Sequence, residues 1–192
     1  MNLTEIIEAV KEQMPERRWK HTLGVRDTAV ILAGRFGEDK DKADLAAILH
    51  DVCKYWTIQD QEAIIRENNL PQDLLHYDKQ LLHSHVGAYV TETRFGIKDE
   101  DILNAIRFHT SGREQMSKLE KIICLADYME PGRDFPGVDK IRKLAETSLE
   151  EALIAGFDST ISFLIQQGKK IYPLTVLTRN SLLDEIRGKS SS

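Results

Sequence analysis

The sequence predicts an all-α protein that folds as a single domain. Apolar residues recur at spacings of three and four along almost the whole chain, which is the period of an amphipathic helix. Strict alternation of apolar and polar residues, the pattern of a half-buried strand, forms no convincing run. The chain of 192 residues is long enough to bury a hydrophobic core, and no internal repeat or shift in composition divides it.

Start and stop signals give the boundaries of the predicted helices in chain order. Pro15 suits the first turn of the second helix, and Asp60, Asp99 and Ser117 suit the N-caps of the fourth, sixth and seventh. The stop signals are glycines that follow periodic segments: Gly37, Gly96, Gly112 and Gly168. The expected helices cover residues 4–14, 15–36, 42–54, 60–68, 81–95, 99–109, 117–129, 138–146, 149–167 and 175–186. We expect one domain over residues 1–189 and a disordered tail at 190–192.

Composition excludes several classes of function. The chain has 26 basic and 31 acidic side chains, and its formal net charge of -5 argues against broad nucleic-acid binding. No segment approaches the roughly 18 apolar residues of a membrane span, and the first ten residues lack the features of a signal peptide. We therefore expect a cytoplasmic protein without membrane or nucleic-acid partners, in which Cys53 and Cys124 are reduced and buried.

Polar side chains lie in register with the apolar faces of several predicted helices. The stretch AAILHDVCKYW is one case, since His50 and Asp51 directly follow buried apolar residues although burying polar groups is costly. One inward-facing histidine is usually satisfied by a hydrogen bond. Five polar groups on separate helices more simply indicate a bound cation: His21, His50, His83, His109 and Asp127.

These residues stand in motifs that resemble a known superfamily. His21 in RRWKHTLGV, the pair His50 and Asp51 in HDVCK, and Asp127 in CLADYMEP resemble the H…HD…D signature of HD-domain metal-dependent phosphohydrolases. Further runs indicate one family within this superfamily: LLHSHVGAYV, IRFHTSGREQMSKLEKIICLADYMEPGRDFPGV and RKLAETSLEEAL. From about residue 17 to 178 the chain is similar to the bacterial HD-domain family of symmetrical bis(5'-nucleosyl)-tetraphosphatases.

The resemblance implies a single HD-type helical bundle with a metal site in its core. It also implies that diadenosine tetraphosphate is cleaved into two ADP by attack of a metal-bound hydroxide. The implied metal ligands are His21, His50, Asp51 and Asp127. His83 and His109 are expected near the substrate phosphates or a second metal, and together with Asp51 and Asp127 they are the expected catalytic residues. The family is associated with iron, and manganese, cobalt or zinc also suit imidazole and carboxylate ligands, as one or two ions.

A tetraphosphate substrate also needs cationic and polar partners. Arg18 and Lys54 lie one helical turn from His21 and His50, so they are expected near the metal. Thr110, beside Ser111, and Arg133 are expected to add phosphate contacts, as are Asp51, His83, His109 and Asp127. The run KIYPLT is expected to close over a nucleobase or ribose: Lys170, Ile171, Tyr172, Pro173, Leu174 and Thr175.

Alternative functions keep some of these features and change others. An HD phosphohydrolase of another nucleotide, such as a deoxynucleoside monophosphate or a guanosine alarmone, uses the same fold and metal. A nucleotide-binding signalling module holds the ligand without turnover. In the preferred interpretation the partner is a small-molecule dinucleoside polyphosphate, and a homodimer is a further hypothesis, because Ile161, Leu164 and Ile165 form an apolar stripe.

Overall fold

The computed structural model describes residues 1–190 of the chain, and within them the prediction of an all-α fold is confirmed. The described part of the chain forms ten α-helices and two short 3-10 helices, and it contains no strand. The helices are α1 (Leu3–Lys11), α2 (Glu16–Phe36), α3 (Lys40–Leu49), α4 (Ile58–Glu67), α5 (Leu82–Phe95), α6 (Glu100–Arg107), α7 (Lys118–Met129), α8 (Val138–Leu144), α9 (Leu149–Gln166) and α10 (Pro173–Ser190). The 3-10 helices η1 (Gln72–His76) and η2 (Lys79–Leu81) lie in the segment expected to be a loop around Pro71.

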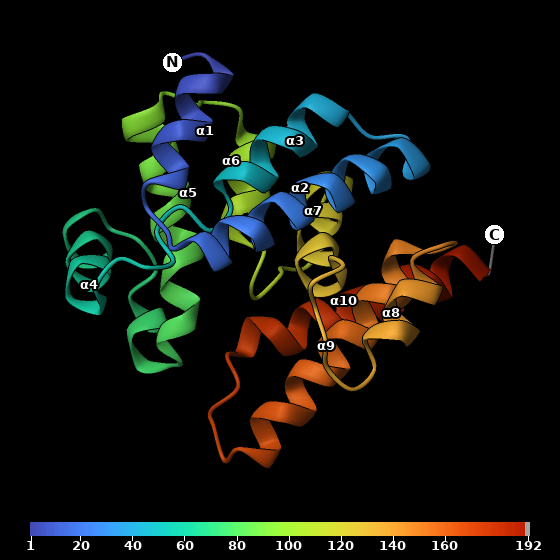
Figure 1. Cartoon of the computed structure of the whole chain (residues 1–192). Coiled ribbons are helices and arrows are strands. Elements are labelled where there is room, and N and C mark those ends of the chain that lie inside the picture. The colour runs from blue at the N-terminus through green and yellow to red at the C-terminus, as the bar shows by residue number, and fades with distance from the viewer. Residues whose placement is uncertain (191–192) are drawn as a thin grey trace.

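The helices pack around α7, which crosses the middle of the molecule (Figure 1). Helix α2 packs on both α3 and α7, and α6 packs between α5 and α7. Helices α8, α9 and α10 form a second group, in which α9 contacts both α8 and α10 as well as α7. The polar residues singled out in the sequence come from α2, α5 and α7 and from the turns that follow α3 and α6.

The core consists of the apolar faces that the sequence period predicts. Leu32 of α2, Ile48 of α3, Ile122 of α7 and Phe157 of α9 are all fully or almost fully buried. Removing such side chains from water is the main favourable contribution to folding. Cys53 and Cys124 are buried free thiols, which confirms that part of the prediction. Within residues 1–190, no helix combines the length and the apolar character that crossing a bilayer requires.

Several predicted helices end earlier than expected, and two of the shortened ends carry site histidines. Helix α3 ends at Leu49 rather than at residue 54, and α6 ends at Arg107 rather than at 109. His50 and His109 follow in turns, where the Nδ1 atom of each ring bonds to the carbonyl oxygen three residues earlier, on Ala47 (2.6 Å) and Ile106 (2.7 Å). These ring contacts satisfy carbonyl groups that the helix ends leave free.

Most helix starts also differ from the prediction by one or two residues, as at α4 and α10. The N-cap of α4 is Thr57, which accepts a hydrogen bond from the Asp60 backbone N–H, so Asp60 lies inside the first turn. Helix α10 begins at Pro173 rather than at residue 175, because a proline suits a first helical position, where no backbone donor is needed. The helix runs to Ser190, the first residue of the expected disordered tail, and residues 191 and 192 lie outside the described residues.

Candidate functional site

Asp51 is the centre of a buried polar cluster. Its side chain is fully shielded from solvent, and its two oxygens face opposite groups of partners. The Oδ2 atom lies 2.7 Å from Arg18 Nε and 3.1 Å from His50 Nε2. The Oδ1 atom lies 3.1 Å from His83 Nε2 and 3.8 Å from His109 Nε2. One carboxylate therefore joins four side chains that are far apart in sequence.

Asp127 completes the cluster from α7. Its Oδ1 atom lies 3.0 Å from His21 Nε2 and accepts a hydrogen bond of 2.6 Å from Arg133 Nη2. His21 Nε2 also lies 3.8 Å from Asp51 Oδ2. The six side chains that the sequence placed on inward faces or in the HD pair thus meet at one place: His21, His50, Asp51, His83, His109 and Asp127.

The outward-facing nitrogen of three histidine rings is held by an acceptor. His21 Nδ1 lies 3.0 Å from Glu130 Oε1, and the His50 and His109 Nδ1 atoms bond to backbone carbonyls. A carbonyl oxygen only accepts, so Nδ1 of His50 and His109 carries the hydrogen. In the neutral ring the Nε2 atom then presents a lone pair to the cluster, as in histidines that bind metals.

Several buried polar atoms of the cluster have no hydrogen-bond partner among the described residues, as expected of a site that binds a metal ion. Among the described residues, His21 Nε2, His50 Nε2 and Asp51 Oδ1 are buried and have no hydrogen-bond partner. Such atoms are costly to bury unless a cation replaces their lost hydration. Two ligand sets have all their donor atoms within 4.8 Å of one another: His21, His50 and Asp127, and His50, Asp51 and His109. The two sets share His50, and their donors fit a transition-metal ion.

The charge states of the two carboxylates and of His109 agree with this fit, whereas for His50 the effect of burial is outweighed by the Asp51 carboxylate, which raises its pKa. Burial opposes ionisation of Asp51, yet His50 and His83 hold its pKa well below the usual range. Burial also opposes the charge on Asp127, but His21 and Arg133 keep the pKa of its carboxyl group well below normal. Burial lowers the pKa of His109 to about 3, so this ring is neutral at physiological pH. Ionised carboxylates and neutral imidazoles are the forms in which these groups bind metals.

Three of the expected phosphate-binding residues lie beside the cluster. Arg18 donates a hydrogen bond to Asp51, and the guanidinium group of Arg133 donates to both the carboxylate and the backbone carbonyl oxygen of Asp127. Burial lowers the pKa of Lys54, whose charge also interacts with Asp51. All three cations stand close to the carboxylates rather than in open solvent.

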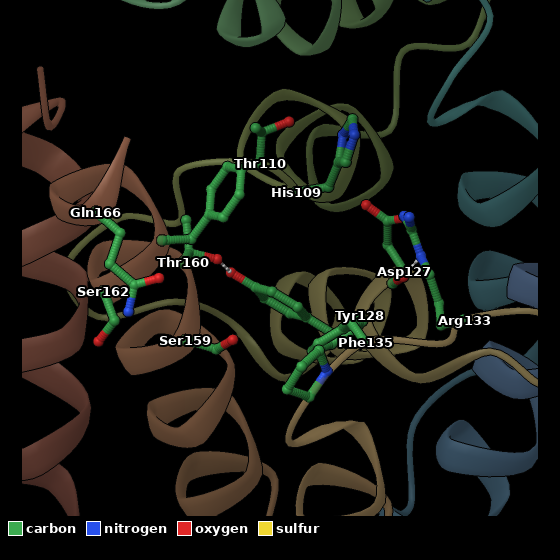
Figure 2. Close-up of a pocket in the computed structure, with 12 residues that line it drawn as sticks. His109, Thr110, Asp127, Tyr128, Arg133, Phe135, Ser159, Thr160, Ser162 and Gln166 are labelled. Carbon is green, nitrogen blue, oxygen red and sulfur yellow. Dashed lines mark hydrogen bonds and ion pairs between the residues drawn. The ribbon is translucent and has the colours of Figure 1, made fainter. Parts of the chain in front are cut away.

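A cavity of about 670 Å3 opens from the cluster toward α9, and we call it the α9 cavity. Its wall includes His109, Thr110, Asp127 and Arg133 on one side and residues of α9 on the other (Figure 2). The Oγ1 atom of Thr110 is buried without a hydrogen-bond partner in the described part of the chain. The volume of the α9 cavity lies within the 300–1,000 Å3 that ligand pockets usually have.

The expected nucleoside-binding run at residues 170–175 lies elsewhere. Tyr172 is buried with its ring centre 5.1 Å from that of Tyr77, and Lys170 donates a hydrogen bond to the His76 carbonyl oxygen. Residues 173–175 belong to α10, so the connection between α9 and α10 is shorter than expected. No residue of this run lines the α9 cavity. Its contact with a nucleoside stays a prediction.

Two parts of the site were not anticipated from the sequence. Glu130, which orients His21, stands three positions after Asp127 in the quoted motif CLADYMEP, and this helical spacing was the available signal. Glu130 also accepts a hydrogen bond from the Gly132 backbone N–H at 2.6 Å. A Cβ atom at Gly24 would lie 2.5 Å from Glu130 Oε2, so α2 needs a glycine there. The α9 side of the cavity had no comparable signal.

Replacing Glu130 with alanine is expected to weaken metal binding about 10- to 100-fold, because His21 loses the acceptor that fixes its ring. Competition titration with a chromogenic chelator measures this affinity. Glu130→Gln keeps an acceptor oxygen and should recover most of it, while thermal unfolding of both variants checks the fold. An alanine variant that binds metal as tightly as the parent protein would rule out this role.

The geometry can now be compared with known proteins. Residues 18–132 match the family model of the HD domain. This range contains all six side chains of the buried cluster. The match therefore includes the residues whose convergence was inferred from helical register.

Curated bacterial proteins are similar over nearly the whole chain. The protein named symmetrical bis(5'-nucleosyl)-tetraphosphatase from Bacillus subtilis is 48% identical over 183 residues, covering 95% of this chain and 98% of the relative. The protein of the same name from Staphylococcus aureus is 43% identical over 178 residues, covering 92% of each. The crystal structure of a predicted HD superfamily hydrolase involved in NAD metabolism from Clostridium acetobutylicum has a TM-score of 0.92 at 42% identity. That comparison covers 96% of this chain and 98% of the other.

Proposed function

Because this chain belongs to the HD-domain family of symmetrical bis(5'-nucleosyl)-tetraphosphatases, we propose that it hydrolyses diadenosine tetraphosphate into two ADP. The observation that carries the proposal is the buried cluster around Asp51, whose unpaired donor atoms suit metal ions and which opens into the α9 cavity. These residues would hold a metal ion beside the cavity wall to which His109 and Asp127 belong. The chain is accordingly a metal-dependent phosphoanhydride hydrolase.

The proposed metal ligands are His21, His50, Asp51 and Asp127, and iron is the proposed metal. When bound, the metal lowers the pKa of water and withdraws charge from phosphoryl oxygens. We assign His109 to the same centre as a ligand of a second ion, because its Nδ1 hydrogen bonds to a backbone carbonyl and its Nε2 lone pair faces Asp51. His83 lies 3.1 Å from both Asp51 Oδ1 and His109 Nε2, so it borders the same position.

Cationic side chains neutralise the substrate in this proposal. Four linked phosphates carry several negative charges, and Arg18, Lys54 and Arg133 surround the cluster from three segments of the chain. A guanidinium group can form two parallel hydrogen bonds with phosphate oxygens. The buried Thr110 hydroxyl oxygen at the cavity wall lies free to take part in a further hydrogen bond.

The reaction adds one water molecule across the middle anhydride of the substrate. The water oxygen forms a bond to one of the two central phosphorus atoms, and the bridging P–O bond to the other breaks. Asp127, whose carboxylate borders the cavity, orients the water by accepting a hydrogen bond. One water proton stays on the phosphate that was attacked and the other is transferred to the oxygen of the leaving phosphate. Each half leaves as ADP, and these protons pass to solvent as the two terminal phosphates ionise.

Oligomeric state, location and the absence of nucleic-acid partners stay predictions. A homodimer stays a prediction, for which the apolar residues that α9 and α10 expose, such as Ile165 (63% exposed) and Leu177 (44% exposed), are the available support. Cytoplasmic location and the absence of nucleic-acid partners likewise rest on composition and charge. Light scattering of the purified chain measures the oligomeric state directly.

Metal dependence and substrate choice test the proposed function together. Protein stripped with a chelator and reconstituted anaerobically is offered diadenosine tetraphosphate with iron, manganese, cobalt or zinc in turn. We expect no turnover without metal and the fastest turnover with iron. Deoxynucleoside monophosphates and guanosine alarmones serve as rival substrates. Preferential hydrolysis of either rival would overturn the assignment of the substrate.

A further inference from the structure

The side of the α9 cavity away from the buried cluster has a different chemistry from the cluster itself. Figure 2 shows His109, Asp127 and Arg133 at one side, and Ser159, Thr160, Ser162 and Gln166 at the other. Aromatic surface comes from three lining residues: Tyr128, Phe135 and Phe163. Phe163 is 55% exposed, although an aromatic ring of this size is usually buried. Binding of phosphate groups does not require an aromatic surface, so these rings indicate another part of a ligand.

The ring of Tyr128 is held rigidly between the two sides of the α9 cavity. Its hydroxyl group is hydrogen-bonded to Thr160 Oγ1 at 2.7 Å, and its ring packs edge-on against buried Phe157, with ring centres 5.9 Å apart. A Cβ atom at Gly156 would lie 3.0 Å from the Tyr128 ring, so α9 approaches this ring very closely. Packing from behind therefore holds the ring in place beside the cavity. Rigid aromatic surfaces bind flat apolar groups at little entropic cost.

A neighbouring cavity of about 640 Å3 contrasts with this one. It shares Arg133 with the α9 cavity, but its other charged groups include Arg17, Arg18, Lys20 and Glu130, set among small or aliphatic residues. Such a surface suits phosphate oxygens and gives no aromatic surface on which a base can stack. The two cavities meet at Arg133, beside the carboxylate of Asp127.

The proposed substrate has two identical nucleosides at the ends of its phosphate chain. Cleavage of the middle anhydride places the centre of that chain at the buried cluster, so the nucleosides lie on either side of it. From the aromatic wall and the polar groups of α9, we infer that the α9 cavity binds one nucleoside of the dinucleotide. The base stacks on aromatic surface, and the amide of Gln166 and the hydroxyl groups of Ser159 and Ser162 take its polar edge and the ribose. This inference rests on the proposed function and extends it to substrate recognition.

Two variants of opposite design test the inference by steady-state kinetics. Phe163→Ala removes aromatic surface from an exposed position, and Ser159→Trp fills the cavity. Both are expected to raise the KM for diadenosine tetraphosphate about tenfold. Phe163→Ala loses the stacking of a base on an aromatic side chain, which contributes on this scale, and Ser159→Trp occupies the space of the base. Inorganic tetraphosphate, which has no nucleoside, should inhibit parent and variants with the same Ki. Ile165→Ala, on the exposed face of the same helix and outside the cavity wall, is the matched control.

The outcomes separate this inference from the proposed function. A raised KM with an unchanged Ki for inorganic tetraphosphate supports a nucleoside site in the α9 cavity. An unchanged KM in both variants overturns it, and so does a parallel rise of KM and Ki, which would indicate damage to the phosphate site. Parent protein that leaves diadenosine tetraphosphate intact would contradict the proposed function instead.

Discussion

Replacing Asp51 with asparagine is expected to lower kcat by at least about a thousandfold, which corresponds to about 4 kcal/mol in the barrier. Asp51 is the carboxylate that contacts Arg18, His50 and His83, and the other side chains of the cluster lie around it. Asparagine keeps the shape of the side chain but removes the negative charge and one acceptor oxygen. Bound metal, measured by elemental analysis, should fall together with turnover.

Asp44→Asn is the matched control for this substitution. Asp44 lies on α3, the helix that leads to Asp51, and forms its ion pair with Arg26 away from the cluster. Its replacement removes a carboxylate of the same kind, yet turnover and metal content should remain within about twofold of the parent. If Asp51→Asn retained more than about a tenth of the parent activity, the cluster would not be the active site.

Replacing Phe157 with alanine is expected to lower the free energy of unfolding by about 3–5 kcal/mol. Phe157 is fully buried on α9 and packs against Tyr128, so alanine leaves a cavity where α9 meets α7. Phe163→Ala, a change of the same volume at a 55% exposed position of the same helix, should cost less than about 0.5 kcal/mol. Equal destabilisation of the two variants in denaturant unfolding of the metal-free protein would contradict the described packing of α9.

The helical fold could be predicted because one signal, the spacing of apolar residues, determines both the elements and their buried faces. The same register placed His21, His83 and Asp127 on inward faces, and the structure brings these side chains to one cluster. Helix ends were less accurate. His50 and His109 were expected inside helices, but ring contacts with backbone carbonyls leave them in turns, and a contact of this kind has no signature in sequence.

The cavity beside the cluster could not be predicted for a different reason. Its α9 wall consists of serine, threonine and glutamine side chains with one exposed phenylalanine, a mixture typical of any solvated helix face. Only the packing of α9 against α7 turns that face toward Asp127. Glu130 is an intermediate case, since its spacing from Asp127 was visible but its contact with His21 depends on how α2 crosses the end of α7.

Product analysis tests the central claim most directly. Metal-loaded protein is incubated with diadenosine tetraphosphate, and the nucleotides are separated by chromatography over the time course. Symmetrical hydrolysis at the buried cluster predicts ADP as the sole nucleotide product, with two molecules formed for each substrate consumed. Formation of ATP and AMP, or substrate that stays bound and intact with every metal, would contradict the account.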